Sequence, residues 1–196
     1  MNSKANCIVI SGGPSVGKTT LISLMRARGQ QVLQEVAIEI IKEGVYHPAK
    51  NRQEFQEEIL RRQIYLEANR LLDRVCFCDR GLLDGAAYYL NDGLPVPDIF
   101  EQLDISHYRA CFVLMPLETF EQETLRPNFE DLEFTRRITP LIDQCYRQRG
   151  VPVITVPNIG IEKRLEFIEN ECMKLNLFET RHRVQRPRHL AMQTQL

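Results

Sequence analysis

Residues 12–19 read GGPSVGKT, and this short segment constrains the fold of the chain more than any other feature. It fits the phosphate-binding pattern G-x-x-x-x-G-K-[ST]. The apolar run at residues 7–10 is typical of a buried parallel strand, and the apolar residues within 20–25 recur at helical spacing. In a strand–glycine loop–helix unit, backbone N–H groups converge on a polyphosphate at the helix N-terminus. A glycine turn before an ordinary helix is the alternative, and the flanking elements argue against it.

The loop pattern gives individual side chains a role. Lys18 would place a positive charge on the β- and γ-phosphates, and the Thr19 hydroxyl would bind Mg²⁺. We expect Lys18 to be an exposed loop residue that contributes little to packing. The guanine-specific sequence Asn-Lys-x-Asp is absent, which favours ATP as the nucleotide. The expected nucleotide-binding residues are Gly12, Gly13, Pro14, Ser15, Val16, Gly17, Lys18, Thr19 and Thr20.

Composition is that of an ordinary globular protein. The 196 residues suffice for one α/β domain, and a second domain is not expected. A net charge of −1 gives no general attraction to nucleic acid or membranes. No apolar run approaches the ~20 residues of a membrane span. The N-terminus leads straight into the first predicted strand and leaves no room for a signal peptide, so we expect a cytoplasmic protein.

The chain has six cysteines. Cys7, Cys76, Cys78 and Cys111 fall in runs predicted to be core strands, where a free cysteine behaves as a small hydrophobic residue. Residues 76–78 form C-x-C rather than C-x-x-C, and no second pair with histidine completes a zinc pattern. We therefore expect reduced thiols and no zinc site.

Five short apolar runs alternate with helical patterns. This alternation predicts a parallel sheet with helices on both faces, a three-layer α/β fold. The runs are residues 7–11, 31–34, 74–78, 110–115 and 152–156.

Two further segments are expected to cover this sheet. The longest helix candidate, residues 51–73, has an imperfect apolar stripe that is typical of a partly exposed lid or flap helix. Residues 116–133 are rich in charge and contain two prolines, which predicts a mobile lid loop. We expect a P-loop domain at residues 1–178, followed by a basic, flexible tail at 179–196.

A second group of candidate site residues follows the third run. Asp79 ends a strand at the edge where α/β proteins bind ligands, so it could hold Mg²⁺ directly or through water. Arg80 could grip an anionic or polar substrate in fork geometry. The alternative is an Asp79 that caps the next helix with Arg80 as its surface partner. Asp84 could bind substrate or compensate the dipole of that helix.

Glu35 follows the second run. A carboxylate at that strand end would face the γ-phosphate across the cleft and could take a proton from an acceptor hydroxyl. Glu35 could equally be the first-turn glutamate of a helix over residues 35–43.

Arginines near the lid are candidates for stabilising the transferred phosphoryl group. Arg126, within the charged loop, could close over the equatorial oxygens, where such a contact is worth several kcal/mol. Nearby Glu121 and Glu123 make a surface ion pair the alternative. Arg137, beside the apolar stripe of the next helix, is the second candidate and is assigned to the substrate.

Four segments resemble the predicted AAA-type ATPases of the NadR/Ttd14-like group, which belong with the P-loop kinases. The resemblance covers roughly residues 5–178 and implies the sheet order 2-3-1-4-5, a lid role for Arg126 and the pair Asp79–Arg80. The chain shows no arginine finger or hexamer signature, so a ring motor is not implied. The segments are residues 11–21 (SGGPSVGKTTL), 35–41 (EVAIEII), 79–89 (DRGLLDGAAYY) and 145–154 (CYRQRGVPVI).

Three functions are consistent with these residues. The leading hypothesis is an ATP- and Mg²⁺-dependent phosphotransferase acting on a small hydroxylated acceptor such as a nucleoside or nucleotide. The second is a nucleotide-switched regulatory NTPase with slow hydrolysis. The third is an NTPase that engages nucleic acid or anionic lipid through basic residues 181–189. The sequence leaves the acceptor and the oligomeric state open.

Overall fold

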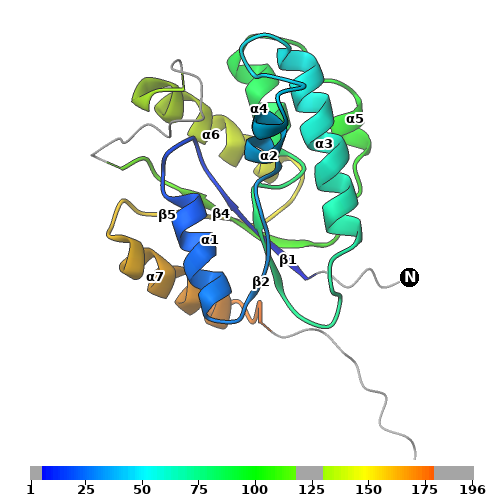
Figure 1. The fold of residues 1–196 in the computed structure, drawn as a ribbon. Helices are drawn as coiled ribbons and strands as arrows, with labels where there is room; N and C mark the ends of the chain where they lie inside the picture. Colours follow the sequence, from blue (N-terminus) through cyan, green and yellow to red (C-terminus); the bar gives the residue numbers. More distant parts are fainter. Residues whose placement is uncertain (1–5, 118–129, 179–196) are drawn as a thin grey trace, which may run out of the picture.

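A computed structural model describes residues 6–117 and 130–178. Parallel strands form one sheet in the order β2-β3-β1-β4-β5, which confirms the predicted order (Figure 1). The strands are β1 Cys7–Ser11, β2 Gln31–Leu33, β3 Cys76–Asp79, β4 Tyr108–Leu114 and β5 Val153–Val156. The helices are α1 Lys18–Ala27, α2 Val36–Glu43, α3 Arg52–Ala68, α4 Asp84–Asn91, α5 Ile99–Gln102, α6 Leu132–Gln148 and α7 Ile161–Lys174.

The side chains of β1 alternate between two cores, one on each face of the sheet. Cys7 and Val9 face the core that contains residues of α4 and α6. Ile8 and Ile10 face the core built with α1 and α7. Because β1 is buried throughout, its sequence is continuously apolar up to Ser11, as expected of a central parallel strand. The three-layer α/β prediction is therefore confirmed.

Helix α3 is shorter than the predicted helix at residues 51–73. It ends at Ala68, and the following loop is held by the buried side chain of Asn6, whose Nδ2 donates to the carbonyls of Leu71 (2.9 Å) and Arg74 (2.8 Å). These contacts fix the chain between α3 and β3 in a loop conformation. The face of α3 that packs inward is partly polar, with Gln56 and Glu67 among its buried residues, and this explains the imperfect apolar stripe.

The loop between β1 and α1 is supported from below by Arg164 of α7. This arginine is almost fully buried, and burial lowers its pKa. Its guanidinium nevertheless donates to the carbonyls of Val16 (2.6 Å), Met115 (2.8 Å) and Pro157 (3.1 Å). One side chain thus joins the glycine loop to the ends of β4 and β5.

Replacing Arg164 with methionine should destabilise the fold by about 2–4 kcal/mol, because buried carbonyls lose a charged donor. Urea unfolding measures this loss. The matched control is Lys163→Met on the exposed neighbouring position, which should change stability by no more than about 0.5 kcal/mol. Equal unfolding midpoints for the two variants would show that the carbonyls find other donors.

Candidate active site

The glycine loop makes close backbone contacts that only glycine allows. Gly12 has φ 133° and Gly17 has φ 90°, both in the region that disfavours other residues. A Cβ atom on Gly12 would lie 2.7 Å from the Leu114 carbonyl oxygen, and one on Gly13 would lie 2.6 Å from Cγ2 of Thr135. These glycines let the loop pack directly on β4 and α6.

Two threonines of α6 fix the loop from the side. The hydroxyl of Thr139 accepts a hydrogen bond from Gly13 N (3.1 Å), and the hydroxyl of Thr135 donates to the Pro14 carbonyl (3.0 Å). Both threonines are buried. Sequence analysis missed them, and their only signal is the four-residue spacing that places two hydroxyls on one helix face. Ser15 Oγ is buried and bonds to no described residue, which leaves a hydroxyl for a ligand of the loop.

Lys18 differs from its expected exposed position. The side chain is only 3% exposed, and Nζ donates to the Gly13 carbonyl at 2.6 Å. The expectation fails because α1 begins at Lys18 itself, so the loop wraps around the ammonium group. The ammonium therefore closes the loop on itself, at the place where the sequence pattern puts the phosphates.

Asp79 and Thr19 come together at the end of β3. Thr19 Oγ1 donates to Asp79 Oδ2 at 3.4 Å, and Asp79 is almost fully buried. A hydroxyl and a carboxylate are the hard oxygen donors that Mg²⁺ prefers, so these residues fit that ion. Thr20 lies next to them on the exposed side of α1.

Arg80 connects three parts of the site. Its Nε donates to Glu35 Oε1 (2.8 Å), and its Nη1 donates to the Gly12 carbonyl and to Asp84 Oδ1, each at 3.2 Å. Burial opposes the charged guanidinium, but Tyr88, Glu35 and Asp84 hold the pKa of Arg80 well above its ordinary value. Nη2 is buried and bonds to no described residue, so one donor is left for a ligand. Arg80 is thus a buried ion-pair residue rather than a surface partner of Asp79.

Arg80 is also strained in its backbone. Its φ of 67° lies in the left-handed region, which a non-glycine residue adopts at a cost of about 1–3 kcal/mol. Its N–H continues the sheet by donating to the Ile10 carbonyl at 3.0 Å. The turn directs the guanidinium toward Glu35 and the glycine loop.

Glu35 is the residue immediately before α2, and its side chain makes no capping hydrogen bond to that helix. The buried carboxylate faces Arg80 instead. The structure therefore brings together Glu35, Arg80 and the glycine loop, although they lie far apart in the sequence.

Asp84 is buried and saturated by protein donors. Oδ1 accepts from Ser11 Oγ (2.5 Å) and Arg80, while Oδ2 accepts from Gly81 N (3.1 Å) and Tyr146 OH (2.6 Å). These contacts give Asp84 a role that neither sequence-based alternative described: it holds β1, the turn after β3, and α6 in one arrangement.

A pocket opens beside Glu35 and Arg80, and its lining combines apolar walls with a few polar groups, as in small-molecule sites. Apolar and aromatic side chains from α2, α3, α4 and α5 make most of the wall, and sequence analysis did not identify them. Its lining includes Phe55, Gln56, Tyr88, Phe100 and Glu130.

Of the two lid-side arginines, only Arg137 lies within the described part of the chain, and it is not part of this arrangement. Arg137 is exposed on α6 and pairs with Glu133 of the same helix at 2.8 Å. It borders an open depression with Arg52 and Asp92 rather than the pocket beside Glu35. Arg126, most of the lid at 116–133 and the tail at 179–196 lie outside the described residues.

A parallel sheet in the order 2-3-1-4-5, with this glycine loop after its first strand, defines the class of the P-loop NTPases with a kinase-like fold. The sequence matches the AAA domain family over residues 7–164, most of its length, so the chain belongs to that family. No curated protein sequence matches the chain.

Solved structures of low sequence identity share the fold. Thymidylate kinase from Candida albicans superposes with a TM-score of 0.64 at 12% identity, over 91% of this chain and 96% of that chain. NadR in complex with NR gives a TM-score of 0.67 at 16% identity, over 93% of this chain but only 53% of NadR. Deoxyadenosine kinase from M. mycoides with bound dATP gives 0.54 at 14% identity, over 85% and 99%.

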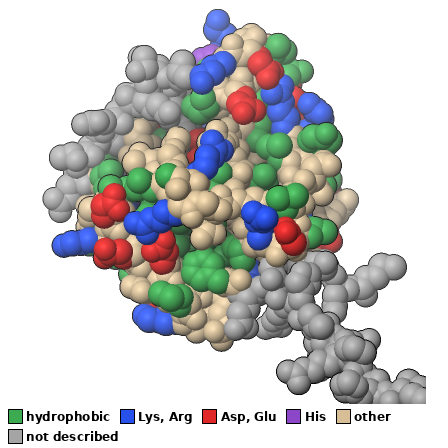
Figure 2. All heavy atoms as spheres, turned by 60° about the horizontal axis from the view of Figure 1, so that its bottom comes forward, with side chains coloured by type: hydrophobic (Ala, Val, Ile, Leu, Met, Phe, Trp, Pro, Cys, Tyr) green, Lys and Arg blue, Asp and Glu red, His purple; other side chains and the backbone are tan. Residues whose placement is uncertain are grey.

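None of the described helices has the length and apolarity to span a bilayer. On the face shown in Figure 2, basic side chains lie beside acidic ones instead of forming one basic area. The ion pair of Arg28 with Glu169, at 2.8 Å, is an example of this mixing on α1 and α7.

Replacing Asp84 with asparagine should destabilise the protein by about 2–4 kcal/mol, because one carboxylate oxygen becomes an NH₂ group facing donors. Thermal and urea unfolding measure the change. The control is Asp143→Asn, which removes the partly exposed pair with Arg147 and should cost at most about 1 kcal/mol. A fully stable Asp84→Asn protein with lost activity would instead assign Asp84 to the substrate.

Proposed function

We propose that this chain is a Mg²⁺-dependent phosphotransferase that moves the γ-phosphoryl group of ATP to a hydroxyl of a small acceptor in the pocket beside Glu35. One observation carries the proposal: Glu35 and Arg80 line the pocket, and Arg80 also bonds to Gly12 at the start of the glycine loop. The same ion pair thus borders both the expected phosphate site and the pocket that we assign to the acceptor.

In this proposal the glycine loop holds the phosphates of ATP. Lys18 and the loop N–H groups neutralise the β- and γ-phosphates, while the described contact of Lys18 with Gly13 keeps the ammonium in place. Thr19 and Asp79 would hold Mg²⁺, which would neutralise charge on the transferred group. Val16 and Gly17 would contribute backbone N–H groups to the phosphates, and Arg164 holds this part of the loop through the Val16 carbonyl.

Glu35 acts as the general base. Arg80 holds the Glu35 carboxylate at the pocket, so Glu35 can accept the proton of the acceptor hydroxyl as its oxygen attacks the γ-phosphorus and ADP leaves. The free Nη2 donor of Arg80 would bind the acceptor or the transferred group. Arg126, in the lid, would stabilise charge on that group in the transition state. Arg137 would contact the substrate only if its side chain left Glu133 and turned toward the pocket.

The charges of the pocket favour an acceptor without a phosphate. Among its described lining residues, Glu35, Asp84 and Glu130 are acidic, and Arg80 is the one cation. A phosphorylated acceptor would place a dianion beside these carboxylates at a high desolvation cost. The aromatic rings of Phe55, Tyr88 and Phe100 suit a flat ring system.

Gln56 supports the same acceptor class. Its side chain is buried on the pocket wall, and an amide offers both a donor and an acceptor to a heterocycle. Of the proteins that share the fold, one is named deoxyadenosine kinase and another binds NR. We therefore propose a nucleoside-like acceptor ahead of a nucleotide.

A panel of nucleosides and their monophosphates, incubated with Mg²⁺ and labelled ATP, tests the proposal. We expect transfer to a nucleoside-like molecule at least tenfold faster than to its monophosphate, with the Lys18→Ala variant as the inactive control. Preferred transfer to monophosphates would contradict the charge argument. Slow hydrolysis with no acceptor from the panel would favour the regulatory NTPase over the kinase.

Glu35→Gln should lower turnover by about 10²–10⁴-fold while ATP affinity stays nearly unchanged, because the amide keeps the shape but cannot take a proton. Initial rates and fluorescent-nucleotide titration measure the two quantities. The matched control is Glu39→Gln, on the exposed side of α2, the helix that follows Glu35, and it should behave as wild type. If Glu35→Gln lowers only the melting temperature, Glu35 serves to hold Arg80.

A further inference from the structure

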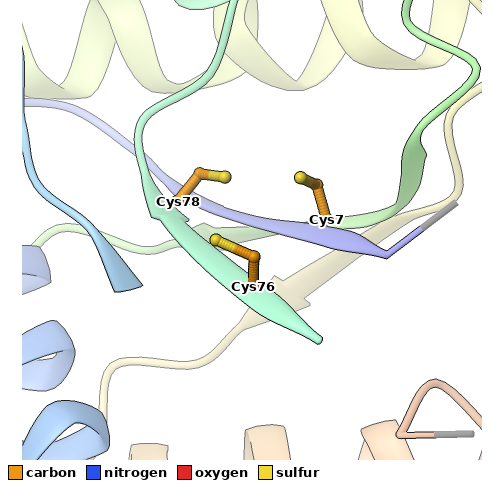
Figure 3. Close-up of side chains that lie close together, drawn as sticks. All are labelled: Cys7, Cys76 and Cys78. Atoms are coloured by element: carbon orange, nitrogen blue, oxygen red, sulfur yellow. The ribbon is translucent and has the colours of Figure 1, made fainter. Parts of the chain in front are cut away.

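Three cysteine side chains converge inside the sheet. Cys7 lies on β1, and Cys76 and Cys78 lie on the adjacent strand β3 (Figure 3). Cys7 is in register with Cys76, and alternate residues of a strand share a face, so all three thiols lie on one side of the sheet. Their sulfur atoms all lie within 4.8 Å of one another, and all three residues are fully buried.

The spacing of the sulfurs is closer to that of a shared metal ion than to that of a disulfide. Three thiolates at the usual sulfur–metal bond length of about 2.3 Å stand about 4.0 Å apart in a trigonal plane. A disulfide needs two sulfurs at about 2.05 Å and leaves the third thiol unused.

The surroundings favour a soft cation in three-fold coordination. Among the described residues, no further His, Cys, Asp or Glu ligand atom joins the three thiols, whereas structural zinc sites normally have four ligands. Neighbouring core residues such as Val9 and Cys111 are fully buried, so the cluster has no contact with solvent. Thiolate ligands in such a setting select soft ions such as Cu(I).

Arg70 brings a positive charge toward the cluster through Asn6, whose Oδ1 also accepts from Cys7 Sγ at 4.0 Å. Arg70 is held near the strand ends by a bond from its Nε to Asn6 Oδ1 at 2.6 Å. A cationic side chain is thus already fixed close to the thiols.

We propose that Cys7, Cys76 and Cys78 form a binding site for one soft, thiophilic cation of the Cu(I) class. Binding replaces thiol protons with metal–sulfur bonds, so affinity falls as the pH is lowered. The bound ion would clamp β1 to β3, the strands that lead to the glycine loop and to Asp79. Because the three thiols are fully buried, entry of the ion requires local opening of the fold.

Metal titration of the full chain, reduced and free of metal and nucleotide, tests the site. Cd²⁺ should produce the ultraviolet thiolate-to-cadmium charge-transfer band with a stoichiometry of one ion per chain. Cu(I), added without oxygen in competition with a chromogenic chelator, should displace the bound Cd²⁺. Either ion should raise the melting temperature, since a ligand that binds only the folded state stabilises it.

Variants assign the ligands. Cys7→Ala and Cys76→Ala should lose the one-ion stoichiometry and the thermal shift, whereas Cys172→Ala, a fully buried cysteine of α7 in the other core, should keep both. Far-UV circular dichroism checks that each variant is folded. Loss of binding in Cys172→Ala, or full binding by Cys76→Ala, would overturn the proposal.

X-ray absorption of the cadmium-loaded wild-type protein gives an answer that needs no variant. We expect a first coordination shell with three sulfur atoms. A shell dominated by oxygen or nitrogen, or a wild-type protein that shows no charge-transfer band while folded, would show that these cysteines are only core residues.

Discussion

The arrangement of the site depends on one buried cation, the guanidinium of Arg80, which needs hydrogen-bond acceptors. A guanidinium removed from water costs several kcal/mol unless acceptors compensate it, and Nε and Nη1 of Arg80 find acceptors on three separate segments, while Nη2 is left for a ligand. Glu35 comes from the start of α2, the Gly12 carbonyl from the glycine loop, and Asp84 from α4. Satisfying Arg80 therefore fixes these segments relative to one another. The strained backbone of Arg80 is tolerated because the surrounding contacts determine its position.

Asp84 extends this network into the body of the domain. Its donors include Ser11 at the end of β1 and Tyr146 of α6, and burial raises the pKa of Tyr146, with Asp84 acting in the same direction. The phenol therefore remains a hydrogen-bond donor across the physiological range. Since α6 also supplies Thr135 and Thr139 to the glycine loop, one helix supports both the phosphate side and the acceptor side of the proposed site.

The buried carboxylate of Glu67 anchors α3 to the sheet. Glu67 of α3 accepts from Gln63 Nε2 (2.7 Å) and Tyr108 OH (2.8 Å), and it lies 2.5 Å from His107 Nε2. Tyr108 OH in turn accepts from Leu82 N at 2.7 Å, just after Arg80. The polar face of α3 is thus anchored to the sheet, which explains why this helix does not need a continuous apolar stripe and how it stays in place beside the pocket.

The sequence by itself determined the fold class and the residues at the strand ends, and the resemblance to a known family implied the sheet order. A glycine loop is a local pattern, and the carboxyl ends of parallel strands share one edge, so Lys18, Asp79 and Glu35 could be predicted as neighbours. Only the tertiary structure decided that Lys18 is buried, that Asp84 is saturated, and that Thr135, Thr139 and Arg164 hold the loop. It also decided that three cysteines meet, because this depends on the register of β1 with β3. These contacts join residues far apart in the chain, and helix orientation and strand register, which arise from packing, leave no local signal in the sequence.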